Sequence, residues 1–152
     1  MNMRNVLTVV YFVLAIYSFS GGLVNGVANF SSWKLISAED FPVVHKYVTK
    51  RILAVYVPFF FLSIPVNIVL IWFHPPAIST MLVEIAATVL NLFIWVITTT
   101  LAIPIRKQLD QVKSTELIDR LVKVHLYLRV IPGSVAMIVT ALMMYQVLGA
   151  AS

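Results

Sequence analysis

Long stretches without a charged side chain divide the sequence into four apolar runs. The runs cover residues 6–30, 52–73, 85–105 and 130–152. A membrane-spanning helix needs about 20 consecutive apolar residues, and long continuous runs favour helices over the short alternating strands of a barrel. The pattern predicts an all-α, multi-pass integral membrane protein. Its single transmembrane domain is expected to cover residues 1–152, with spans at about 6–30, 52–73, 82–103 and 130–149.

Capping residues indicate where the second and fourth helices begin. Ser37, followed by two acids and Pro42, is typical of a helix start, so helix two is expected to begin near Ala38. Helix four is expected to begin after Ser114, because apolar residues then recur on one face, and span three is expected to stop at Pro104. The pattern predicts an up-down four-helix bundle with cytoplasmic extensions of helices two and four. Kinks are expected at the prolines inside the helices, Pro58, Pro65 and Pro132.

The composition agrees with a membrane protein. Apolar residues make up 61% of the chain and charged residues 11%, whereas a soluble domain has roughly 25% charged residues. The chain has no cysteine, which excludes thiol catalysis, disulfides and cysteine-ligated iron–sulfur clusters. The net charge of +5 is explained by membrane topology rather than by nucleic-acid binding.

The basic residues predict the orientation of the chain. Only Arg4 lies on the side of the N-terminus, and the second loop and C-terminus have none. The other ten lie in or beside the first and third loops: Lys34, Lys46, Lys50, Arg51, Arg106, Lys107, Lys113, Arg120, Lys123 and Arg129. Positive loops stay inside, so loops one and three are expected in the cytoplasm and both termini outside an inner or plasma membrane. We expect the first run to be a retained span, because no Ala-x-Ala-type cleavage site of a signal peptide follows it closely.

Each predicted span also carries one stripe of polar or small residues at helical spacing. Lipid offers such groups no partner, so the four stripes are expected to face one another. They could be hydrogen-bonded contacts between helices, or they could line a binding site. The stripes are Tyr11, Ser18, Gly22, Asn25 and Asn29; His45, Thr49, Tyr56, Ser63, Asn67 and His74; Glu84, Thr88, Asn91, Trp95 and Thr98; and His125, Arg129, Gly133, Ala136 and Thr140.

Depth along the helices separates two groups of candidate residues. His74 and Glu84 lie near the outer boundary. The larger group lies near the cytoplasmic boundary and comprises Asn25, Asn29, Trp33, His45, Thr98, His125 and Arg129. Gly22 and Gly26 form a small-xxx-small pair on the first span, which allows the backbone of a neighbouring helix to approach closely.

This cytoplasmic-side group suggests proton chemistry on a lipophilic molecule. A neutral histidine is a general base near physiological pH, and Arg129 could stabilise an oxyanion or enolate. We assign catalysis to His45, His125 and Arg129. We assign substrate binding to Asn25, Asn29, Trp33, Tyr56, Asn67, Asn91, Trp95 and Thr98. The competing interpretation is that the histidines and Arg129 are interfacial residues that face lipid headgroups.

Metal and haem sites find less support in the sequence. No HExxH or acid-rich ligand spacing is present, so no metal site is predicted. A haem held by His45 and His125 stays an alternative, because two histidines on neighbouring helices can serve as axial ligands.

Three short segments resemble a family of small four-span membrane proteins that includes the fungal anthrone oxygenases. Trp33, the pair Asp40–Phe41 and His45 resemble the first loop of that family. Residues 103–109 (Ile-Pro-Ile-Arg-Lys-Gln-Leu) resemble its Val-Pro-hydrophobic-Asn-x-x-Leu segment, with Arg106 at the asparagine position. Residues 121–129 resemble its approach to span four, with His125 and Tyr127 where the family often has tryptophan.

The resemblance implies cofactor-free oxygenation of an electron-rich aromatic compound. On this sequence His45 would form a carbanion that reacts with dioxygen, and His125 and Arg129 would stabilise the developing anion. The function expected is thus an oxidoreductase-like enzyme or a binder of a lipophilic aromatic molecule. An accessory or transporter subunit without chemistry and a haem-binding electron carrier stay open. The expected partners are membrane lipid, a lipophilic small molecule and a second copy of the chain in a homo-oligomer.

Overall fold

The computed structural model of the protein describes residues 3–72 and 78–149, and every regular element in these ranges is a helix. The elements are α1 (Met3–Val24), η1 (Asn25–Asn29), α2 (Phe30–Ser32), η2 (Trp33–Leu35), α3 (Phe41–Trp72), α4 (Ile78–Ile97), η3 (Thr98–Ala102), α5 (Ile103–Leu109), α6 (Thr115–His125), η4 (Leu126–Val130) and α7 (Ile131–Gly149).

Most of these elements follow one another without a break and form four long rods. The four rods are Met3–Leu35, Phe41–Trp72, Met81–Leu109 and Thr115–Gln146, and each is long and apolar enough to cross a membrane. Only 11% to 22% of the apolar window of each rod is buried inside the bundle. The remaining apolar surface faces outward, as expected for contact with lipid. The sequence-based prediction of four helices long and apolar enough to span a membrane is confirmed.

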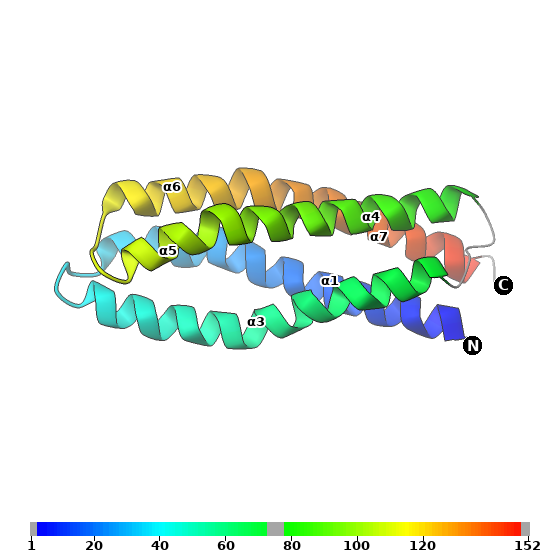
Figure 1. The fold of residues 1–152 in the computed structure, drawn as a ribbon, viewed down its shortest axis with the longest axis horizontal. Coiled ribbons are helices and arrows are strands. Elements are labelled where there is room, and N and C mark those ends of the chain that lie inside the picture. The colour runs from blue at the N-terminus through cyan, green and yellow to red at the C-terminus, as the bar shows by residue number, and fades with distance from the viewer. Residues whose placement is uncertain (1–2, 73–77, 150–152) are drawn as a thin grey trace.

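The four rods lie side by side in one elongated bundle (Figure 1). The segments at 36–40 and 110–114 lie at one end, which we call the loop end. The start of α1 and the end of α7 lie at the opposite end, which we call the terminal end. The helix α1 packs against α3 and α7, and α4 packs against α7 and α3.

Two helix boundaries differ from the sequence-based prediction. Helix α3 begins at Phe41 rather than near Ala38, because the Ser37 hydroxyl accepts a hydrogen bond from Asp40 N at 3.0 Å within a turn that precedes the helix. Span three does not stop at Pro104, because α5 continues it to Leu109. The start of α6 at Thr115 is confirmed, with the Ser114 hydroxyl accepting from Leu117 N at 3.2 Å.

Two of the π-helical turns explain how proline is accommodated. The turn η3 ends at Ala102, two residues before Pro104, and η4 ends at Val130, two residues before Pro132. Proline lacks an amide hydrogen and its ring collides with the preceding helical turn. A π turn widens that part of the backbone, so the helices pass these prolines without ending. Pro58 and Pro65 lie inside α3, which changes direction along its length in Figure 1.

The buried apolar residues form two clusters, one toward each end of the bundle. Tyr11, Leu70, Ala87 and Met143 pack together toward the terminal end. The cluster at the loop end comprises Phe30, Trp33, Phe41, Ala102, Ile105, Leu109, Ile118 and Leu121. The loop-end cluster therefore joins parts of all four rods and holds the candidate histidines in place.

Candidate functional site

Four of the predicted site residues lie in π-helical turns. Asn25 and Asn29 lie in η1, Thr98 in η3 and Arg129 in η4. The π turns are rare and occur often at functional sites. The side chains of Asn25 and Thr98 bond locally: Asn25 Nδ2 donates to Gly21 O at 2.7 Å and Thr98 Oγ1 donates to Ile94 O at 2.7 Å.

The buried His125 and the half-buried Arg129 form a hydrogen-bonded pair that reaches α1. His125 Nε2 lies 2.7 Å from the carbonyl oxygen of Gly22, and Arg129 Nη1 lies 3.2 Å from His125 Nδ1. A carbonyl oxygen can only accept and a guanidinium can only donate. These two contacts therefore assign the proton to Nε2 and leave His125 neutral, with both ring nitrogens engaged.

Gly26 makes room for the His125 ring. A Cβ added at Gly26 would lie 2.6 Å from His125 Cδ2, which is closer than real Cβ contacts allow. A Cβ at Gly22 would lie 3.9 Å from His125 Nε2, an ordinary contact. The close contact at this glycine pair is made by a side chain from α6 rather than by the backbone that was expected.

His45 belongs to a separate cluster nearer the loops. Its Nδ1 lies 2.8 Å from Asp110 Oδ1, and Thr49 Oγ1 lies 3.4 Å from its Nε2. The fully buried ring stacks on Phe41, with centroids 5.3 Å apart, and contacts the edge of Trp33 at 4.6 Å. His45 is thus oriented by a carboxylate and two aromatic rings.

Aromatic rings connect the two histidines without bringing them into contact. Phe30 lies 4.8 Å from Trp33 and 4.9 Å from His125, measured between ring centroids. The Arg106 guanidinium lies over the Phe30 ring, 5.0 Å from its centroid. His45 therefore contacts Trp33 and His125 contacts Phe30, so the two histidines pack on different members of one aromatic pair.

A cavity lies inside the bundle between α1, α3, α4 and α7, and Arg129 forms part of its wall. Its empty volume is about 560 Å³, which includes space open to the surroundings. The wall combines many apolar groups with a few polar ones: Tyr11, Ala15, Ser18, Phe19, Gly22, Phe60, Ser63, Asn91, Ile94, Arg129, Val130, Gly133, Ala136, Met137 and Thr140.

The polar groups of the cavity wall differ in how they are satisfied. Asn91 Nδ2 donates to the Tyr11 hydroxyl at 2.8 Å, and Thr140 donates locally to Ala136 O at 2.7 Å. The Ser18 hydroxyl oxygen and Arg129 Nε are buried, and neither has a partner among the described residues. Unsatisfied buried polar atoms are rare in native structures and call for an explanation such as a bound molecule.

The predicted substrate-binding residues are thus divided among several places. Of the eight, Asn91 lines the cavity, whereas Asn25, Asn29, Trp33 and Thr98 lie nearer the loop end. Tyr56 covers Gly21 and packs on Tyr17, with ring centroids 5.4 Å apart. Trp95 is 37% exposed on the outside of the bundle. Asn67 belongs to a polar cluster around Glu84.

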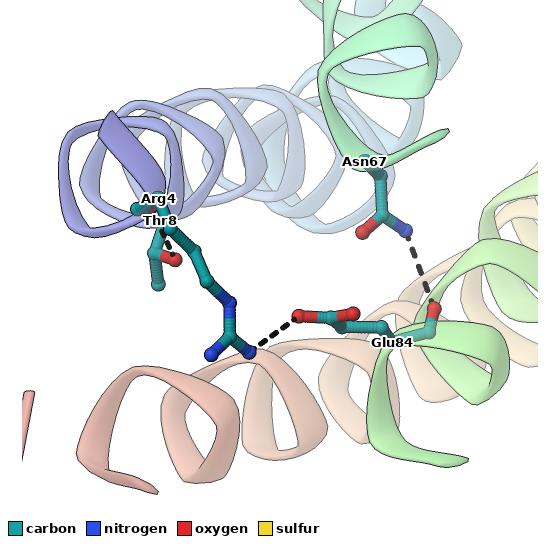
Figure 2. Close-up of polar contacts among 4 residues, drawn as sticks. All are labelled: Arg4, Thr8, Asn67 and Glu84. Carbon is teal, nitrogen blue, oxygen red and sulfur yellow. Dashed lines mark hydrogen bonds and ion pairs between the residues drawn. The ribbon is translucent and has the colours of Figure 1, made fainter. Parts of the chain in front are cut away.

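This polar cluster lies toward the terminal end and joins three helices. Figure 2 shows Arg4 of α1 reaching Glu84 of α4, with Arg4 Nη2 and Glu84 Oε1 3.3 Å apart. Asn67 of α3 points toward the same residue and donates to Glu84 O at 3.4 Å and to Thr88 Oγ1 at 2.7 Å. His74, the other residue expected near Glu84, lies outside the described residues.

Sequence reasoning missed several functional neighbours. Asp110 was not expected beside His45, because 65 residues separate them and only the packed loop end brings them together. Ala15, Phe19 and Phe60 line the cavity, yet in the sequence they resemble any other apolar residue of a span. Ser18, Gly133 and Ala136 lie on the predicted stripes, and this spacing was the signal that could have identified the cavity.

The described residues offer little to a metal ion or to a haem iron. Residues 3–72 and 78–149 contain no group of three or more His, Cys, Asp or Glu side chains that could hold a metal. His125 Nε2 is hydrogen-bonded to Gly22 O and His125 Nδ1 to Arg129, so neither nitrogen is free to bind an iron.

Comparisons with protein-family models, curated proteins and solved structures find no match to this chain.

Proposed function

We propose that this protein is a multi-pass membrane protein that binds a lipophilic aromatic molecule in the cavity of its helical bundle. The loop end faces the cytoplasm, the termini face the opposite side of an inner or plasma membrane, and the helices alternate in direction. Ten of the eleven Lys and Arg residues lie in or beside the first and third loops, which supports this orientation.

The single observation that carries the proposal is the cavity with its sparse polar wall. Small-molecule sites are concave and mostly apolar, with a few well-placed polar groups that fix the orientation of the ligand. Here Arg129 and Ser18 provide unsatisfied polar atoms, and Phe19, Phe60 and Met137 provide apolar contact. Flat rings suit such a wall because aromatic side chains pack favourably against them.

The geometry supports binding better than catalysis by His45. A general base has to lie within hydrogen-bond reach of the proton that it removes. No histidine is among the described residues that line the cavity, and His45 packs against Trp33 and Phe41 instead. His125 acts on the cavity through Arg129, which it holds by a hydrogen bond. We therefore propose a positioning role for His125.

The proposal is tested by filling the cavity with a side chain. Ala136 lines the cavity and is 7% exposed, so Ala136→Leu places three additional carbon atoms where the ligand would lie. We expect wild-type protein, purified in mild detergent, to release a lipophilic aromatic compound on solvent extraction. Ala136→Leu should carry less than a tenth of the wild-type amount, measured by mass spectrometry.

The matched control is Ala141→Leu, because Ala141 lies on the same helix but on its exposed face. This variant should retain the wild-type amount of compound, and thermal melting should show that both variants are folded. Equal retention in Ala136→Leu and Ala141→Leu would contradict the proposal. Absence of any compound from wild-type protein, together with a stable complex with another membrane protein, would favour an accessory subunit.

A further inference from the structure

Arg129 is a half-buried cation without an acidic partner among the described residues. The three ion pairs among the described residues join Arg4 to Glu84, Lys34 to Asp119 and His45 to Asp110. Asp110 and Asp119, two acids that could have reached Arg129 from the loop end, are therefore engaged elsewhere. Asp40, a further acid of this end, accepts a hydrogen bond from the Ser37 hydroxyl at 2.6 Å.

The surroundings of Arg129 do not replace the missing negative charge. Its one hydrogen-bond partner among the described residues is the neutral His125, and its Nε is buried without a partner. The charged side chain that acts on it is the buried Arg106, a second cation, which repels it. A charged group inside a membrane protein is costly and is normally paired. The counter-charge is therefore expected from a bound molecule.

The position of Arg129 shows where that molecule would lie. Arg129 lines the cavity, as does the unpartnered Ser18 hydroxyl, which can donate a further hydrogen bond. Apolar residues and the Tyr11–Asn91 pair form the rest of the wall. A planar guanidinium binds a carboxylate or a similar oxyanion with two parallel hydrogen bonds.

We infer that the molecule bound in the cavity is a lipophilic anion. Its carboxylate, phenolate or enolate oxygen bonds Arg129 and Ser18, and its apolar body lies against Phe19, Phe60 and Met137. This inference rests on the proposed function and narrows it to one class of ligand. A neutral aromatic compound of the same shape would leave Arg129 without a counter-charge.

The test uses two probes of nearly equal shape that differ in charge. We propose equilibrium dialysis of 9-anthracenecarboxylate and 9-anthracenemethanol against the protein in phosphatidylcholine nanodiscs, with empty nanodiscs as blank. Wild-type protein should bind the carboxylate about 10-fold more tightly than the alcohol, as expected for a hydrogen bond between charged groups. Arg129→Gln should abolish this preference by weakening the binding of the carboxylate.

Arg120→Gln is the matched control, because Arg120 is exposed on α6 and does not line the cavity. It should behave as wild type. Equal binding of the two probes to wild type, or a preference that survives in Arg129→Gln, would overturn the inference. Should Arg129→Gln fail to fold, wild type and Ala136→Leu decide: the inference requires a carboxylate preference in wild type and loss of carboxylate binding in the variant.

The outcomes separate this inference from the proposed function. If both probes bind with equal affinity and Ala136→Leu loses both, the cavity is a binding site as proposed. The inference that its ligand is an anion is then wrong. Binding of neither probe above the empty nanodiscs would count against both.

Discussion

At the residue scale, the site depends on a glycine that leaves space for a histidine. Gly26 lies so close to His125 that no larger residue fits, and His125 in turn holds Arg129 at the cavity wall. The i, i+4 spacing of His125 and Arg129 was readable in the sequence, because residues four apart share one face of a helix. Their separation from His45 was not readable, because it depends on the Phe30 and Trp33 rings.

Gly26→Ala should destabilise the bundle, whereas Gly22→Ala should not. The methyl group at position 26 collides with His125 Cδ2, and overpacking of this kind costs about 1–3 kcal/mol. At position 22 the same methyl group makes an ordinary contact 3.9 Å from His125 Nε2. Thermal melting in detergent measures both variants. Equal melting temperatures for the two would show that His125 does not occupy the place described.

Asp110 provides a second residue-scale prediction. His45 Nδ1 lies 2.8 Å from Asp110 Oδ1, and this bond ties α3 to the end of α5. Asp110→Ala should therefore loosen the loop end while ligand retention stays at the wild-type level, since neither residue lines the cavity. Hydrogen exchange of α5 amides, combined with the extraction assay, tests this. Loss of the ligand in Asp110→Ala with an undisturbed loop end would place His45 in the binding site after all.

At the element scale, the helices are joined by few but specific polar contacts. The Arg4–Glu84 pair connects α1 to α4, and Asn67 connects α3 to α4. The helix boundaries were partly predictable, because Ser114 is a recognisable cap. The π turns before Pro104 and Pro132 were not predicted, because a proline in an apolar run usually indicates a kink or an end. The continuation of span three to Leu109 was missed for this reason.

Arg4→Met should destabilise the bundle by about 3–5 kcal/mol, because it leaves the buried Glu84 carboxylate without its partner. Glu84 is completely buried, so water cannot replace the lost contact. The double variant Arg4→Met with Glu84→Leu removes both charges and should recover most of the stability. Unfolding in mixed micelles measures the three proteins. A double variant as unstable as Arg4→Met would show that the charge of Glu84 is not the cause.

At the scale of the whole molecule, the sequence was most informative. Four uncharged runs predicted four membrane-spanning helices, because the need for about 20 apolar residues leaves few alternatives. Of the predicted site residues, Asn91 and Arg129 lie on the cavity wall. Its lining was predicted less well, because residues that face lipid and residues that face an apolar cavity have the same composition.

The chain contains no cysteine, so its orientation can be measured with single substitutions. Gln111→Cys lies at the loop end and Gln146→Cys near the opposite end of the bundle. A membrane-impermeant maleimide added to intact cells should label position 146 and should label position 111 only after permeabilisation. Labelling of position 111 alone in intact cells would reverse the proposed orientation.

The central claim is that the cavity between α1, α3, α4 and α7 is a binding site. The most direct measurement is an experimental structure of the protein crystallised with 10-bromo-9-anthracenecarboxylate, with the bromine located by its anomalous scattering. We predict one bromine peak inside the cavity, with the carboxylate within hydrogen-bond distance of Arg129 and the rings between Phe19 and Met137. Bromine peaks confined to the lipid-facing surface of the helices, with the cavity unoccupied, would contradict the account.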